Sequence, residues 1–157
     1  MDKVSIYCRR GFRACGGNAA IEFAIVAPVL FVMLLGMIQF AIIFNNITVL
    51  TNATSAGALL FSEGRSFTSP YSSAVTAVKS AAGSLTTANL TITTSVNGAA
   101  CATDAACLTA FGQGGVPATV TVTYPCPLVF SAGTLKWLGI STSQVCPLSS
   151  TMTAVVQ

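Results

Sequence analysis

The chain has 157 residues, enough for one domain with an appended segment, and 53% of them are hydrophobic while only 7% carry a charge. Because soluble globular proteins contain about 25% charged residues, this composition favours a structural protein of a membrane or cell envelope over a cytosolic enzyme. The chain has no histidine and only four carboxylates, so the commonest general base and the commonest metal ligand are missing.

The net charge of +3 is concentrated in the first 17 residues. This segment holds four basic side chains and one acidic one, namely Lys3, Arg9, Arg10, Arg13 and Asp2. Residues 18–157 hold three basic and three acidic side chains, whose charges cancel. Nucleic-acid binding needs a basic surface, which this distribution does not provide, so we expect no nucleic-acid partner. A short basic segment before an apolar one is instead an orientation signal that places residues 1–17 in the cytoplasm.

An uncharged apolar run from Phe23 to Phe44 predicts a membrane span. As a helix it would extend roughly 33 Å, against a hydrocarbon core of about 30 Å. It contains Pro28 and Gly36, residue types that are more frequent in membrane helices than in soluble ones. We therefore expect a single-pass helix in contact with the lipid bilayer, within a longer helix over residues 18–63. A cleaved secretory signal is the alternative, but its apolar region is normally only about 7–15 residues.

After the span, the sequence predicts a small α+β domain outside the membrane, over residues 64–157. Residues 46–62 continue the long helix, and apolar side chains recur at helical spacing within residues 72–84. Alternation of apolar and polar residues predicts strands over 89–96, 118–124 and, less regularly, 150–156. The expected fold class is α+β: a long N-terminal helix, then a second helix and an antiparallel sheet.

A lone glutamate, Glu22, lies in the first turns of the apolar helix. A charge at the centre of a membrane helix costs roughly 2.5–3.5 kcal/mol, and less near the edge, so an offsetting interaction is expected. The helix dipole could supply part of it, and Glu22 could also pair with a freed amine of its own chain at Asn18, four residues earlier.

The junction from Arg13 to Phe23, RACGGNAAIEF, resembles the type IV prepilins, and more closely the TadE-like pseudopilin branch of the tight-adherence (Flp, type IVc) pilus system. The resemblance covers residues 13–44 and implies that a membrane prepilin peptidase cuts after a glycine. Cutting between Gly17 and Asn18 makes Glu22 the fifth mature residue, followed by the expected aromatic, Phe23. Cutting one bond earlier would make Glu22 the sixth.

This resemblance implies a structural, non-enzymatic subunit of a bacterial pilus system with a pilin-like fold. Its cytoplasmic leader, residues 1–17, would be removed, and Glu22 would contact the N-terminal amine of a neighbouring subunit during assembly. The implied partners are the prepilin peptidase, other pilin or pseudopilin subunits and the inner-membrane assembly platform. The implied location is the bacterial inner membrane, with the N-terminus cytoplasmic and the C-terminal domain periplasmic, or an extracellular pilus.

Four cysteines follow the span, an even number that fits an oxidising compartment: Cys101, Cys107, Cys126 and Cys146. They allow three pairings; we favour Cys101–Cys107, which closes a short loop, and Cys126–Cys146, which would join neighbouring strand ends. Zinc binding by these cysteines is the alternative interpretation. Their spacing contains no CxxC pair and the chain has no histidine, so we expect no metal and no cofactor.

Two other functions are alternatives to the pilin hypothesis. An uncut, membrane-anchored adhesin or envelope binding protein would retain residues 1–17, so the mature N-terminus distinguishes it. An envelope hydrolase would need a base beside a nucleophile, and neither histidine nor a Ser-x-x-Lys spacing involving Lys79 or Lys136 provides one. The sequence does not distinguish a subunit that enters the filament from one that stays in the membrane, nor does it give the stoichiometry or a surface ligand.

Overall fold

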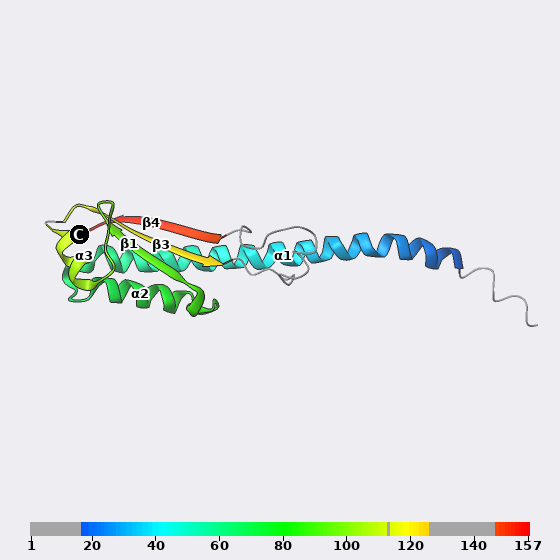
Figure 1. Ribbon diagram of the computed structural model, residues 1–157, viewed down its shortest axis with the longest axis horizontal. Coiled ribbons are helices and arrows are strands. Elements are labelled where there is room, and N and C mark those ends of the chain that lie inside the picture. The colour runs from blue at the N-terminus through cyan, green and yellow to red at the C-terminus, as the bar shows by residue number, and fades with distance from the viewer. Residues whose placement is uncertain (1–16, 113, 126–146) are drawn as a thin grey trace, which may run out of the picture. The chain divides into compact units, whose positions relative to one another are not determined.

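The structure is a computed structural model that describes residues 17–112, 114–125 and 147–157, with side chains from residue 20 onward. Its longest element is the helix α1, Gly17–Ser62, of 46 residues, which contains Pro28 (Figure 1). The chain divides into two compact units, one ending at Phe40 and the other covering Ala41 to Gln157. The predicted helices and antiparallel strands are therefore confirmed as an α+β fold.

The first unit contains the N-terminal part of α1. Its side chains are exposed or, at a few positions, half-buried. The helix can form here without a neighbouring element, because its backbone N–H and C=O groups hydrogen-bond to each other within the helix.

The second unit contains the remainder of α1 and all other described elements. The helical elements are η1 (Gly64–Ser66), α2 (Pro70–Ala81), η2 (Thr87–Asn89) and α3 (Asp104–Phe111). The strands are β1 (Thr91–Val96), β2 (Ala99–Ala100), β3 (Pro117–Pro125) and β4 (Pro147–Val155). They form one antiparallel sheet in the order β2-β1-β3-β4.

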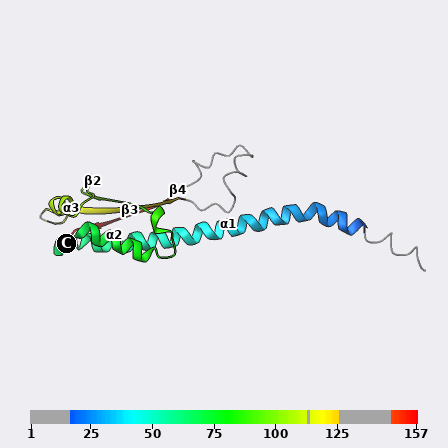
Figure 2. The ribbon, with the colours of Figure 1, turned by 60° about the horizontal axis from the view of Figure 1, so that its bottom comes forward.

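Helix α2 and the C-terminal part of α1 cover one face of this sheet (Figure 2). Strand β3 shows why: Ala118, Val120, Val122 and Tyr124 are buried at alternate positions, as the side-chain period of a strand requires. They share one core with apolar residues of the helices and of the neighbouring strands: Leu50, Ala53, Phe61, Ala74, Val78, Val96, Phe111 and Leu148.

Besides the short helices η1 and η2, the structure contains a β-hairpin and a helix that were not expected from the sequence. One is the β1–β2 hairpin, in which Asn97 and Gly98 both have positive φ, 49° and 80°, as a two-residue hairpin turn requires. The other is α3, which begins after Thr103, whose side chain accepts a hydrogen bond from the Ala106 N–H at 3.3 Å. The Asn-Gly pair and the Thr-Asp cap are both recognisable signals in the sequence.

Candidate functional site

The residues predicted to carry processing and assembly lie in the first turns of α1. Gly17 and Asn18 are described by their backbone alone, as part of the helix. Glu22 is exposed, and Phe23 is 68% exposed. Helical geometry places residues 18 and 22 on one face, one turn apart. The structure therefore places the predicted residues together at one end of the helix, with the carboxylate accessible from outside the chain.

The helix that follows presents a continuous apolar surface. Large hydrophobic side chains that are at least half exposed occur all along it: Ile21, Phe23, Ile25, Val26, Val29, Leu30, Phe31, Val32, Met33, Leu34, Met37, Ile38 and Phe40. The most apolar stretch of α1 has a mean hydropathy of 2.5, and none of it is buried within the chain. Apolar surfaces of this extent mark membrane or protein contacts, and the helix is long and apolar enough to be consistent with a membrane anchor.

In the second unit, a disulfide joins Cys101 to Cys107, with 5.2 Å between the Cα atoms. This is the first of the two pairings favoured from the sequence. Both residues are nearly or fully buried, with exposed fractions of 4% for Cys101 and 0% for Cys107. Cys126 and Cys146, the other predicted pair, lie outside the described residues.

Asp104, one of the few charged residues of the second unit, caps the start of α2 from another element. Its carboxylate accepts hydrogen bonds from the Ser72 hydroxyl at 2.6 Å and from the Ser72 backbone N–H at 2.9 Å. No side chain at the N-cap position of α2, Ser69, makes a capping hydrogen bond, so Asp104 supplies the acceptor that the first turn needs. This role cannot be predicted from local sequence patterns, because the two residues are 32 positions apart.

These hydrogen bonds, the Ser72 hydroxyl first and its backbone N–H second, lower the pKa of the Asp104 carboxyl below its ordinary value. A carboxyl whose pKa is lower in the folded chain stabilises the fold at pH values above its unfolded pKa. That contribution is lost as the pH falls through the folded-state pKa. Asp104 therefore stabilises the second unit at neutral pH as a carboxylate.

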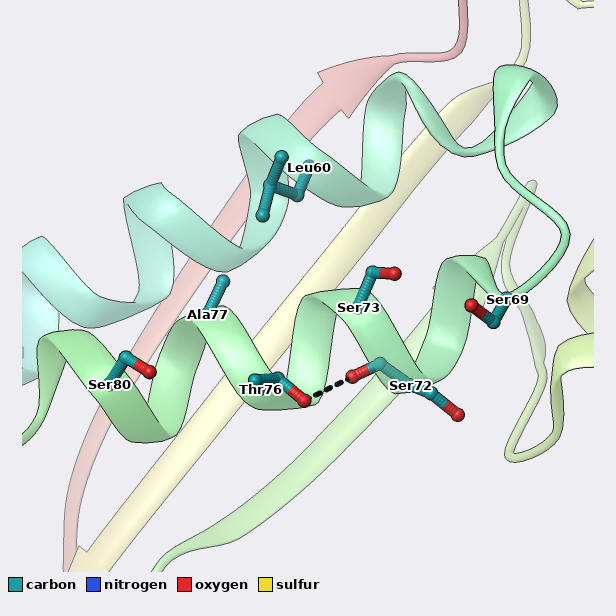
Figure 3. A pocket seen from close by; sticks show the side chains of 7 residues that line it. All are labelled: Leu60, Ser69, Ser72, Ser73, Thr76, Ala77 and Ser80. Carbon is teal, nitrogen blue, oxygen red and sulfur yellow. Dashed lines mark hydrogen bonds between the residues drawn. The ribbon is translucent and has the colours of Figure 1, made fainter.

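A shallow open recess of about 430 Å³ lies beside α2 (Figure 3). Its lining consists of hydroxyl and small apolar side chains, namely Leu60, Ser69, Ser72, Ser73, Thr76, Ala77 and Ser80. One of the hydroxyls, Thr76 Oγ1, donates to the Ser72 carbonyl at 2.8 Å. The lining contains no acid, base or thiol, and the described residues contain no group of three His, Cys, Asp or Glu side chains that could hold a metal ion.

The face of the sheet opposite the core is lined by hydroxyl side chains. They stand in register on three strands: Thr91, Thr93 and Ser95; Thr119, Thr121 and Thr123; Ser149, Thr151 and Thr153. Two pairs hydrogen-bond across strands through their Oγ1 atoms, Thr119 to Thr153 at 2.9 Å and Thr121 to Thr151 at 3.0 Å. Over the described strands this face is polar without ionic groups, so the second unit can expose it to water although it carries few charges.

Comparison with known proteins supports the family resemblance that the N-terminal segment shows. Residues 17–59 match the family described as "TadE-like protein". No curated protein and no solved structure gives a match. The matched residues include the predicted assembly residues Glu22 and Phe23 together with the apolar part of α1. Over residues 17–59, therefore, the chain is similar to the TadE-like family, and this similarity suggests an association with the components of the Tad pilus.

Proposed function

We propose that the protein is a structural, non-enzymatic pseudopilin or minor pilin. A prepilin peptidase cuts it between Gly17 and Asn18, and the mature chain takes part in assembly of the tight-adherence (Flp) pilus. The observation that supports this best is the exposed apolar surface of α1, which directly follows the start of the family match at Gly17. A buried helix of a soluble domain would have this surface covered by its own chain.

In this proposal the apolar helix has two successive environments. It is first held in the inner membrane, with residues 1–17 in the cytoplasm, since they carry the excess of positive charge, and with the second unit in the periplasm. It then packs against helices of other pilin or pseudopilin subunits at the inner-membrane platform. Lipid is as apolar as these side chains, so close contact at small residues such as Ala24, Ala27 and Gly36 would drive the packing.

The structure offers a reason for Gly36 at such a contact. A Cβ atom added at Gly36 would meet no atom of the described residues within 4 Å. Glycine in a helix interior costs about 1 kcal/mol relative to alanine. Since no contact within the described part of the chain requires the glycine, a close approach by a neighbouring helix is the compensation that we propose.

The non-enzymatic part of the proposal is supported by the chemistry of the described surface. The recess beside α2 is lined by hydroxyls, and the carboxylate that contacts one of them, Asp104, accepts both the Ser72 hydroxyl and the Ser72 backbone N–H as the cap of α2. A serine nucleophile is usually activated by an adjacent imidazole or amine, and the chain has no histidine. The exterior unit is therefore proposed to act through contacts.

The test is the mature N-terminus, read by mass spectrometry of the membrane fraction from cells with and without the prepilin peptidase. We expect Asn18 at the N-terminus when the peptidase is active. Gly17→Val should leave the leader uncut, because a β-branched side chain obstructs close approach of the backbone to a protease. Gly16→Val is the matched control and should be cut at the same bond.

Full-length chain beside an active peptidase would contradict the proposal and leave an uncut, membrane-anchored adhesin or binding protein. Cutting of Gly16→Val at a shifted bond would contradict the assignment of Gly17 as the residue before the cut.

A further inference from the structure

We propose that the Cys101–Cys107 disulfide is a redox-controlled latch on helix α3. With the disulfide formed, α3 caps α2 and covers the last turn of α1. With the disulfide reduced to two thiols, α3 leaves both helices while the sheet stays paired. This inference concerns the second unit alone and does not depend on the proposed pilus function.

One end of the latch is fixed to the sheet. Cys101 directly follows β2, and its backbone N–H donates to the Thr94 carbonyl of β1 at 3.0 Å. The Thr94 hydroxyl in turn donates to the Cys101 carbonyl. Thr94 and Cys101 are both buried. Cys101 is therefore held on β1 independently of α3, and the disulfide links this fixed point to Cys107 within the helix.

The other end of the latch is the set of contacts that α3 makes with the helices. Asp104, the first residue of α3, accepts both hydrogen bonds from Ser72 of α2. Phe111, its last residue, packs edge-on against Phe61 of α1, with 5.1 Å between the ring centroids. Its ring also fits against Gly64, where an added Cβ would lie 2.8 Å from a ring carbon. Helix α3 therefore touches the start of α2 and the end of α1 at the same time.

Reduction of the disulfide should release α3 alone, because α3 contributes few residues to the core. Of its eight residues, only Cys107 and Phe111 are buried, and a helix of two turns is not stable by itself. Strands β1, β3 and β4 are joined by registers of six and nine residue pairs that do not include α3. Loss of the disulfide returns conformational freedom to the 101–107 loop, so α3 is the segment that opens first.

The chemistry of opening needs a dithiol reductant. Its thiolate attacks one sulfur of the disulfide and forms a mixed disulfide, and its second thiolate then displaces the remaining protein thiol. The protein gains two electrons and two protons as two thiols, and the reductant becomes a disulfide. Since Cys101 is 4% and Cys107 0% exposed, the reductant reaches the bond only when α3 has already opened. The reduction rate therefore measures how often α3 opens.

The experiment compares amide hydrogen exchange of the full chain in detergent with that of Cys101→Ser/Cys107→Ser, which leaves the other cysteines in place. We expect peptides from α3 and from the first turn of α2 to exchange at least ten-fold faster in the variant, while β3 keeps its exchange rate. An unchanged first turn of α2 would overturn the proposal. Equal acceleration of β1, β3 and β4 would overturn it too, because the disulfide would then stabilise the unit as a whole.

A second variant tests the same coupling without touching the disulfide and serves if the serine pair fails to fold. Asp104→Asn weakens the contact between α3 and α2, so a dithiol should reduce the 101–107 bond several-fold faster, as followed by alkylation and mass spectrometry of that peptide. Ser80→Ala, on the exposed surface of α2 away from Asp104, is the matched control and should leave the rate unchanged. An unchanged rate in Asp104→Asn would overturn the proposal.

Discussion

Glu22 is the residue on which the proposed assembly depends most directly. It is exposed near the start of α1, and the surface around it is apolar. A carboxylate at this position is costly in a membrane unless a positive group offsets it. Two roles are possible for the Glu22 carboxylate: it caps its own helix, or it contacts the amine of a neighbouring mature subunit. These roles predict different levels of pilus assembly when the carboxylate is removed.

We expect Glu22→Ala to be cut normally between Gly17 and Asn18 and to form at least ten-fold fewer pili. The reason is that removal of the carboxylate leaves the peptide bond and the preceding glycine unchanged but removes the partner of the neighbouring amine. Shearing and quantification of surface pili, together with mass spectrometry of the membrane fraction, measure both effects. Glu63→Ala, an exposed glutamate just beyond the other end of α1, is the matched control. Normal piliation in Glu22→Ala would refute the intersubunit role.

For single residues, some roles could be predicted from the sequence and others could not. The Cys101–Cys107 pair could be predicted because six positions separate the two residues and a short loop closes easily. The role of Asp104 could not, because it depends on α3 meeting α2 in three dimensions. Local patterns identify neighbours along the chain, whereas a cap supplied from a distant element requires the tertiary fold.

At the scale of elements, Gly57 and Gly36, both inside α1, have different surroundings. Gly57 is buried, and a Cβ added to it would lie 2.3 Å from Cγ2 of Val78, so Gly57 permits α1 and α2 to approach closely. A Cβ added at Gly36 would meet no described atom within 4 Å. The same substitution at the two positions therefore separates packing within the chain from packing between chains.

Gly57→Ala should destabilise the second unit by roughly 1–3 kcal/mol, the usual cost of overpacking a core. Gly36→Ala should leave its stability unchanged, since Gly36 belongs to the first unit and a Cβ added there would meet no described atom within 4 Å. Denaturant unfolding in detergent measures both. The effects of Gly57→Ala and Val78→Ala should also be non-additive, because the two residues share one contact. Equal stability of Gly57→Ala and the unaltered chain would contradict the close approach.

Helices and strands could be predicted from the sequence where the alternation or helical spacing of their apolar residues is strong. Strand β3 alternates strictly, and the sequence predicts it almost over its full length, whereas β4 begins three residues earlier than expected, at Pro147. Helix α3 has only eight residues, too few to show an amphipathic period, and its position depends on the disulfide and on Phe111. Short elements held by tertiary contacts are the part of the fold that periodicity does not reveal.

At the scale of the whole molecule, the two units differ in what stabilises them. Among the described residues, every buried hydrophobic side chain lies at residue 50 or later, and the partly buried residues packed against this core begin at Ile43. The first unit has a surface suited to lipid or to other helices, and the second has its own core, a disulfide and a polar sheet face. Folding of the second unit should therefore not require the first.

We expect a shortened chain of residues 41–157 to fold without detergent and to retain the Cys101–Cys107 disulfide, because it keeps the complete described core. It should unfold in one cooperative thermal transition, with a midpoint close to that of the second unit in the full chain measured in detergent. The full chain should need detergent or lipid to remain in solution, since α1 exposes its apolar residues before Ala41. Circular dichroism, size-exclusion chromatography and thiol alkylation measure these properties. A shortened chain without a cooperative transition would show that the second unit needs residues before Ala41 for its stability.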